Sequence, residues 1–175
     1  MFLKRFNLVW FFFLLLACQK SDTNFYNLNG KPVNIDTGTK VLIFLNTECP
    51  ICQKYQGSLH QFNQDSVILV FPGQSDTNAV KSFAAYDSIP LTRIIIDTDF
   101  RLTKMLGAKT TPQTIITLNG KVKYKGLIDD RFMALGSARQ FAHVNYIRNA
   151  LISLQQNHAD SIAHTEPVGC LIEPH

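Results

Sequence analysis

The stretch Val41-Leu42-Ile43-Phe44-Leu45-Asn46-Thr47-Glu48-Cys49-Pro50-Ile51-Cys52 joins an apolar run to two closely spaced cysteines. The apolar run is continuous rather than alternating, which is typical of a strand buried on both faces of a sheet. A helix-compatible segment follows from Pro50 to Asn63. Proline suits its first turn, because the N–H that proline lacks would have had no partner there. The pattern predicts a strand–helix junction with two thiols at its mouth.

The chemistry predicted for this junction is redox chemistry. Cys49 would lie at the helix N-terminus, where unpaired N–H groups and the positive end of the helix dipole favour thiolate over thiol. The thiolate is the species that attacks disulfides and peroxides. A C-x-x-C pair can also bind zinc, but the sequence has no second pair at zinc-finger spacing. We therefore expect Cys49 to be the exposed nucleophile and Cys52, deeper in the helix, to resolve the mixed disulfide.

Strands and helices alternate along the rest of the chain. Phe25 to Ile35 predicts a hairpin with an Asn29-Gly30 turn. The remaining expected elements are strands at 66–71 and 91–96, helices at 76–86 and 97–107, a hairpin at 113–125 and an amphipathic helix at 138–156. This order predicts an α/β domain over residues 25–158, with a central mixed β-sheet flanked by helices.

The N-terminus indicates export. Lys4 and Arg5 precede an apolar run, Leu8 to Leu16, that is too short to span a bilayer comfortably and is followed by Ala17-Cys18. Leu15-Leu16-Ala17-Cys18 resembles the bacterial lipobox. We expect residues 1–17 to be a lipoprotein signal peptide.

On that interpretation Cys18 is lipidated, and residues 18–24 tether the domain to a membrane outside the cytoplasm. An uncleaved anchor is the alternative, and it gives the same location. Gln19 after the cysteine favours the outer membrane if the source is a Gram-negative bacterium.

Removal of the first 17 of 175 residues leaves 158, enough for one domain with a proper core. It also removes Lys4 and Arg5, so the formal charge falls from +4 to +2. So small an excess gives no case for nucleic-acid binding. Nothing in the sequence implies an organic cofactor, and a monomer is expected.

Thr110-Thr111-Pro112 stands directly before an apolar strand. Together with the strand–C-x-x-C–helix unit, it resembles the thioredoxin superfamily. The resemblance implies a cis proline at Pro112 that lies against the cysteines, and a Thr111 backbone that binds an extended substrate. It also implies a thioredoxin-like fold and thiol–disulfide exchange.

Three further segments resemble one branch of that superfamily, the AhpC/TSA-like bacterial redoxin-domain proteins with a Gly-Cys-x-Ile tail. They are Thr47 to Cys52, Lys125 to Phe132 and Thr165 to Ile172. The last lies in a C-terminal tail, residues 159–175, that carries Cys170.

The sequence departs from related families at specific positions. Peroxiredoxins carry Thr or Ser three residues before the peroxidatic cysteine and a proline further upstream, where this chain has Asn46 and Leu42. Thioredoxin carries a buried Asp six residues before its first cysteine, where this chain has Ile43.

A proton acceptor would therefore have to come from elsewhere. Glu48, beside Cys49, is one candidate, and a solvated charge is its alternative. The pair Asp129-Asp130 is the other, for which a turn or ion pair is the favoured interpretation.

Cys170 has three interpretations. It is a third redox cysteine docked near Cys49 and Cys52, or it joins those two as a soft ligand for Cu(I), or it is a free or intermolecular thiol. Sco-type copper chaperones use this fold, but their cysteine spacing is C-x-x-x-C.

The favoured function is a membrane-tethered extracytoplasmic thiol–disulfide oxidoreductase. Its partners would be proteins or small thiols and disulfides of the cell envelope. A thiol peroxidase and a copper-binding module are the alternatives.

Overall fold

The computed structural model describes residues 24–62, 64–159 and 162–173. The expected signal peptide, the lipidated Cys18 and all of the tether except Asn24 lie outside the described residues. Among the helices that the structure describes, none is both long enough and apolar enough to cross a membrane.

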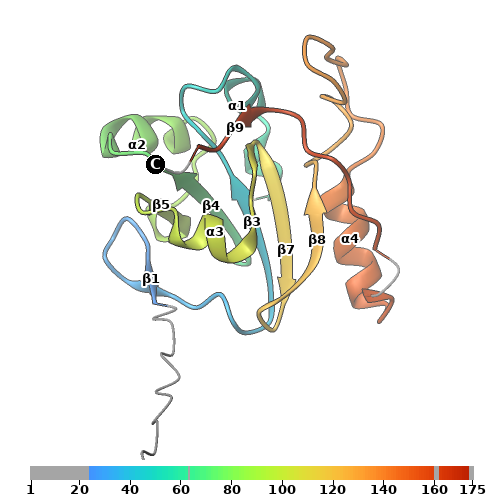
Figure 1. The fold of residues 1–175 in the computed structure, drawn as a ribbon, viewed down its shortest axis with the longest axis horizontal. Helices are drawn as coiled ribbons and strands as arrows, with labels where there is room; N and C mark the ends of the chain where they lie inside the picture. Colours follow the sequence, from blue (N-terminus) through green and yellow to red (C-terminus); the bar gives the residue numbers. More distant parts are fainter. Residues whose placement is uncertain (1–23, 63, 160–161, 174–175) are drawn as a thin grey trace, which may run out of the picture.

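The centre of the molecule is a five-stranded mixed sheet (Figure 1). Its middle strand, β3, runs parallel to β4 and antiparallel to β7. In spatial order the strands are β5 (Ile94–Asp97), β4 (Val67–Pro72), β3 (Thr39–Phe44), β7 (Gln113–Leu118) and β8 (Lys121–Gly126). The predicted mixed sheet is confirmed.

The remaining elements surround this sheet. Two short antiparallel pairs lie outside it, β1 with β2 and β6 with β9. The elements are β1 (Phe25–Tyr26), β2 (Pro32–Val33), α1 (Pro50–Tyr55), η1 (Leu59–Phe62), α2 (Thr77–Ala85), η2 (Leu91–Arg93), α3 (Arg101–Leu106), β6 (Thr110–Thr111), α4 (Tyr146–Gln155) and β9 (Cys170–Leu171).

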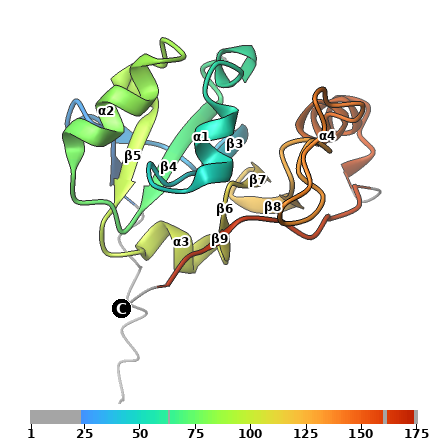
Figure 2. The ribbon, with the colours of Figure 1, turned by 90° about the horizontal axis from the view of Figure 1, so that it is seen from above.

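Helices cover both faces of the sheet. Val41 and Ile43 of β3 belong to one core, with residues of α1, α2 and α4, whereas Leu42 and Phe44 point into a second core with α3. Figure 2 shows α1 and α2 on one side of the sheet and α3 on the other. Because both faces are buried, β3 has the continuous apolar run that the sequence shows. The fold is thioredoxin-like, as the resemblance implied.

Two helices are shorter than expected. The helix predicted over 50–63 ends at Tyr55, because the chain turns at Gly57, whose φ of +80° is left-handed, and resumes as η1. The helix predicted from Asp97 begins at Arg101. The Asp97 carboxylate instead accepts hydrogen bonds from N–H groups in the first turn of α3.

The predicted helix at 138–156 is wrong over its first half, since α4 begins at Tyr146 after an N-cap at Asn145. The residues that precede α4 instead bind the buried carboxylate of Asp130. That carboxylate pairs with Arg139 and accepts backbone hydrogen bonds from His143 at 2.7 Å and Val144 at 2.9 Å. Local amphipathicity carries no information about this distant acceptor.

The buried acids of this core should make the protein sensitive to alkali. Burial raises the pKa of Cys52 to about 12 and, with the neighbouring Asp129 carboxylate, raises that of Tyr55. Unfolded Cys and Tyr lose their protons near pH values of about 8.5 and 10. Above that range the unfolded state binds fewer protons than the folded state, so the free energy of unfolding must fall as pH rises.

We expect urea midpoints to decrease from about pH 9 upward, with a shallower decrease in Tyr55→Phe, which removes one of these acids. The variant should be less stable than the parent at pH 7, because it loses the hydrogen bond to Asp129. A midpoint that stays constant between pH 8 and about 11 would contradict this account.

Candidate functional site

The cysteine pair lies where the sequence predicted it, at the junction between β3 and α1. Cys49 is the N-cap residue of α1, and Pro50 is in its first turn. Cys52 lies one turn further on, and spacing of three residues places both cysteines on one side of the helix. Both are buried, at 2% and 0% exposure. The expectation of an exposed nucleophile at Cys49 is therefore wrong for this state of the protein, in which Cys49 is packed into the core and bonded to Cys170 of the C-terminal tail.

The Thr111-Pro112 peptide bond is cis, as the resemblance implied. The loop that contains it lies against the cysteines, because the carbonyl oxygen of Thr111 is 3.2 Å from the Cys49 sulfur. A C-x-x-C pair and a proline 60 residues later therefore meet in one site.

The disulfide in the structure joins Cys49 to Cys170, across 6.1 Å between their Cα atoms, and Cys52 is a free thiol. The Cys49–Cys52 disulfide that resolution by Cys52 would form is not present in this state. Of the three interpretations of Cys170, the structure matches the redox cysteine docked beside the C-x-x-C pair. Figure 1 shows the described part of the tail crossing beside the start of β7, with β9 next to α1.

The tail approaches the site as a β-strand. β9 pairs antiparallel with β6, so that Cys170 lies opposite Thr111 and Leu171 opposite Thr110. The N–H of Ile172 donates to the carbonyl of Lys109 at 2.9 Å. Figure 2 shows β9 and β6 side by side. The Thr111 backbone, which the resemblance assigned to an extended substrate, here binds the protein's own tail.

A second anchor holds the tail to the edge of the sheet. The hydroxyl of Thr165 accepts a hydrogen bond from the N–H of Leu127 and shares another with the Tyr124 hydroxyl, each at 2.8 Å. The N–H of Thr165 donates to the carbonyl of Lys125 at 3.1 Å. Gly126 allows this approach, because a Cβ there would overlap the Thr165 backbone. The sequence analysis missed Thr165, although a glycine ending a strand indicates a close backbone approach.

Cys52 is held as a neutral thiol. Its sulfur accepts a hydrogen bond from the N–H of Asn46 at 3.5 Å, and the side chain of Thr111 also bonds to it. Both contacts favour the thiolate, but burial outweighs them and raises the pKa of Cys52 to about 12. Asn46, noted in the sequence only as a departure from peroxiredoxins, is therefore part of the site.

The structure separates the two candidates for a proton acceptor. Glu48 is exposed beside Cys49, as a solvated charge would be. Asp129 is buried and accepts from the Tyr55 hydroxyl at 2.8 Å and from Arg131 at 2.9 Å. Asp130 holds the loop before α4, and the Val144 and His143 N–H groups and Arg139 keep its pKa below the ordinary value. The pair has the turn and ion-pair role that the sequence favoured.

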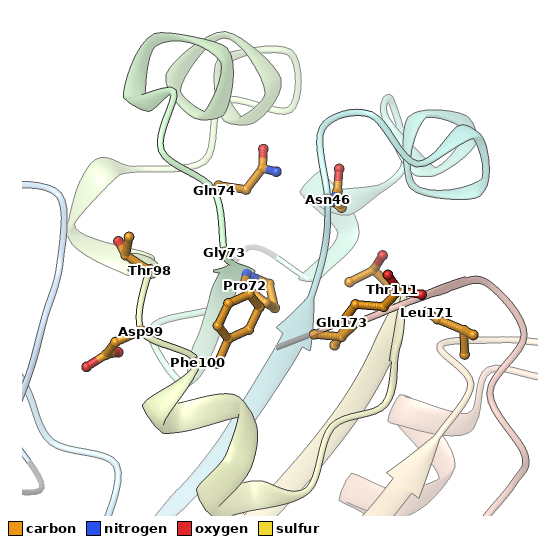
Figure 3. A pocket seen from close by; sticks show the side chains of 11 residues that line it. Asn46, Pro72, Gly73, Gln74, Thr98, Asp99, Phe100, Thr111, Leu171 and Glu173 are labelled. Atoms are coloured by element: carbon orange, nitrogen blue, oxygen red, sulfur yellow. The ribbon is translucent and has the colours of Figure 1, made fainter. Parts of the chain in front are cut away.

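A groove of about 590 Å³ adjoins the tail strand at the carboxyl ends of β3, β4 and β5. Figure 3 shows Pro72, Gly73 and Phe100 on one side and Thr111, Leu171 and Glu173 on the other. Carboxyl ends of parallel strands are the usual binding edge of α/β sheets. Within the described residues, no group of three or more His, Cys, Asp or Glu side chains could hold a metal ion.

Comparisons with known proteins agree on the fold. No protein-family model matches the sequence, and no curated protein does. A hypothetical protein from Sinorhizobium meliloti matches with a TM-score of 0.62 and 18% identity over 85% of this chain and 88% of its own. An uncharacterized conserved protein from Geobacillus kaustophilus matches with a TM-score of 0.62 and 19% identity, over 86% and 87%. StoA from Bacillus subtilis matches with a TM-score of 0.48 and 20% identity, over 59% and 85%. At these identities the first two matches show a shared fold.

The disulfide assignment predicts a specific peptide map. In the oxidised protein, proteolysis without reduction should yield a fragment that links Cys49 to Cys170. Cys52 should resist alkylation at pH 7 until the protein is denatured, because its thiol is buried and neutral. In Cys170→Ser the link should move to Cys49–Cys52. Rapid alkylation of Cys52 in the folded protein would contradict the structure.

Proposed function

We propose that this protein is a thiol–disulfide oxidoreductase in which Cys49 forms a mixed disulfide with the partner and Cys52 resolves it. One observation carries the proposal. Cys49 is bonded to a cysteine on an extended strand that pairs with Thr111 beside the cis proline, and Cys52 is a free thiol one helical turn away. This is the arrangement that a mixed disulfide with a partner would require, with the tail in the partner's place.

The reaction consists of two exchanges. The Cys49 thiolate attacks one sulfur of a partner disulfide, the partner's S–S bond breaks, and its other sulfur leaves as a thiolate. Cys52 then loses its proton and attacks the Cys49 sulfur, which releases the partner's first sulfur as a thiolate. The partner gains two electrons and the Cys49–Cys52 pair loses them. The reverse sequence oxidises a partner dithiol.

The position of Cys49 supports its role as the nucleophile. Cys49 is the N-cap residue of α1, beside the unpaired N–H groups of the first turn, and such groups favour a thiolate once the Cys49–Cys170 bond is broken. Cys52 is fully buried and neutral, so it reacts only when Cys49 already carries a disulfide bond that it can attack. The different environments of the two thiols therefore order the two steps.

The proposal places the enzyme at the cell envelope, tethered by a lipid on Cys18. The support for this location is the signal-like sequence of residues 1–17 and the lipobox pattern that ends at Cys18. The partners are then extracytoplasmic proteins or small thiols and disulfides.

Single-cysteine replacements should separate the two roles. Cys49→Ser should abolish disulfide reduction, because it removes the attacking sulfur. Cys52→Ser should still attack but should accumulate the mixed disulfide, visible as a covalent adduct by mass spectrometry. Both variants should keep the parent's circular dichroism spectrum. A folded Cys49→Ser variant with full activity would sink the proposal. Rapid consumption of hydroperoxide by Cys49 in stopped flow would favour a peroxidase instead.

The rate of resolution should depend steeply on pH. With a pKa of about 12 for Cys52, its thiolate fraction rises about tenfold for each pH unit between 7 and 10. We expect the release of a partner peptide from a preformed Cys49 mixed disulfide to accelerate by that factor in single-turnover experiments. A rate independent of pH over this range would show that Cys52 is not the resolving thiol.

A further inference from the structure

The tail strand occupies the edge to which a partner would have to bind, and its contacts show what that edge accepts. We propose that β6 and the adjoining groove form a binding site for an extended peptide of a partner protein with the pattern Gly-Cys-x-apolar, and that residues 168–172 are its intramolecular stand-in. The inference rests on the proposed function, since the partner's cysteine is the one that exchanges with Cys49.

The position before the cysteine requires glycine. A Cβ on Gly169 would overlap the carbonyl oxygen of Thr111 and lie 3.1 Å from Cδ of Pro112. Thr111 cannot move away easily, because it is buried in β6 and its carbonyl oxygen lies against the Cys49 sulfur. A partner strand in the same register therefore meets the same restriction, and any side chain at this position would push its cysteine away from Cys49.

The positions after the cysteine alternate in their surroundings, as expected of a strand. Leu171 also borders the groove but is 72% exposed, so the corresponding partner residue is only weakly restricted. Ile172 is half-buried, lines the groove and donates its N–H to Lys109. The second residue after the partner's cysteine therefore places its side chain at the groove wall, where an apolar group is favoured.

The groove extends away from the described part of the tail strand, residues 170–173. Its lining includes Pro72, Gly73 and Phe100, on the side opposite the tail (Figure 3). A partner peptide that continued past the apolar position would run along this hollow. The groove is therefore continuous with the site that the tail occupies.

The tail can leave by the same chemistry that the enzyme uses. Cys52, after losing its proton, attacks the Cys49 sulfur, the Cys49–Cys170 bond breaks, and Cys170 leaves as a thiolate that takes up a proton. A Cys49–Cys52 disulfide forms, so the oxidation level of the protein is unchanged. The exchange needs no outside oxidant or reductant, and it exposes the β6 edge to a partner.

A tethered tail competes with free partners at a high effective concentration. Only peptides that satisfy the glycine restriction and the groove can displace it efficiently. The tail therefore acts as a selectivity filter as well as a cover for Cys49.

The test uses the full-length chain with Cys52→Ser and Cys170→Ser, so that adducts on Cys49 persist and the tail cannot bond to it. The probes are three hexapeptides whose cysteine carries thionitrobenzoate: Pro-Val-Gly-Cys-Leu-Ile, Pro-Val-Ala-Cys-Leu-Ile and Pro-Val-Gly-Cys-Leu-Asp. Cys49 attacks the peptide sulfur, the thionitrobenzoate leaves and is followed by absorbance, and mass spectrometry identifies the adduct.

We expect the first peptide to react about tenfold faster than the alanine peptide, since the alanine methyl group would overlap the Thr111 carbonyl oxygen. The aspartate peptide should also be slower. Adding Gly169→Val to this double variant should dislodge the tail strand and accelerate the reaction of Cys49 with the first peptide. The preference for glycine over alanine in the peptide should remain. That preference is measured in both proteins, so the result does not depend on how well the valine variant folds.

A small aromatic disulfide separates failure of this inference from failure of the proposed function. If Cys49 attacks it readily but reacts equally with the three peptides, the peptide site is wrong and the oxidoreductase proposal stands. If Cys49 reacts with none of the disulfides, the oxidoreductase proposal itself fails. Faster reaction of the alanine peptide than of the glycine peptide would also overturn the inference.

Discussion

The backbone of Thr111 is the constraint on which the site depends. Thr111 pairs with Cys170 between strands β6 and β9. Its carbonyl oxygen lies against the Cys49 sulfur, and its side chain forms a hydrogen bond with Cys52. One residue is thus bound to two of the sulfurs and paired through its backbone with the cysteine that carries the third. The cis bond to Pro112 that follows turns the chain directly into β7, so this residue is held by the central sheet.

Covering the site changes the chemistry of its two helical cysteines in different ways. Cys49 is buried and bonded to Cys170, so it cannot act as a thiolate until that bond is broken. Cys52 is buried as a free thiol, and burial raises its pKa to about 12. A sulfur that can change its disulfide partner and a neutral thiol one turn away are what an ordered pair of thiol–disulfide exchanges needs.

Much of this could be predicted from local sequence, and the failures have identifiable causes. Strands with continuous apolar runs were predicted correctly, because their signals lie within a few residues. The start of α4 was missed because Asp130, many residues earlier, binds the preceding segment. The sequence offered Cys170 near Cys49 and Cys52 as one of three interpretations, and it could not choose among them because pairing depends on how close two sulfurs lie in the folded chain.

The sequence by itself determined that Cys49 begins a helix after a buried strand and that a Thr-Pro pair precedes another strand. These are local properties of periodicity, capping and proline stereochemistry. Only the tertiary structure decided which sulfur bonds to Cys49. The route of the tail depends on two contacts, Thr165 with Leu127 and β9 with β6, and each joins segments that lie far apart along the chain. A site that began as two sulfurs in one helical turn is, in the folded protein, a site of three.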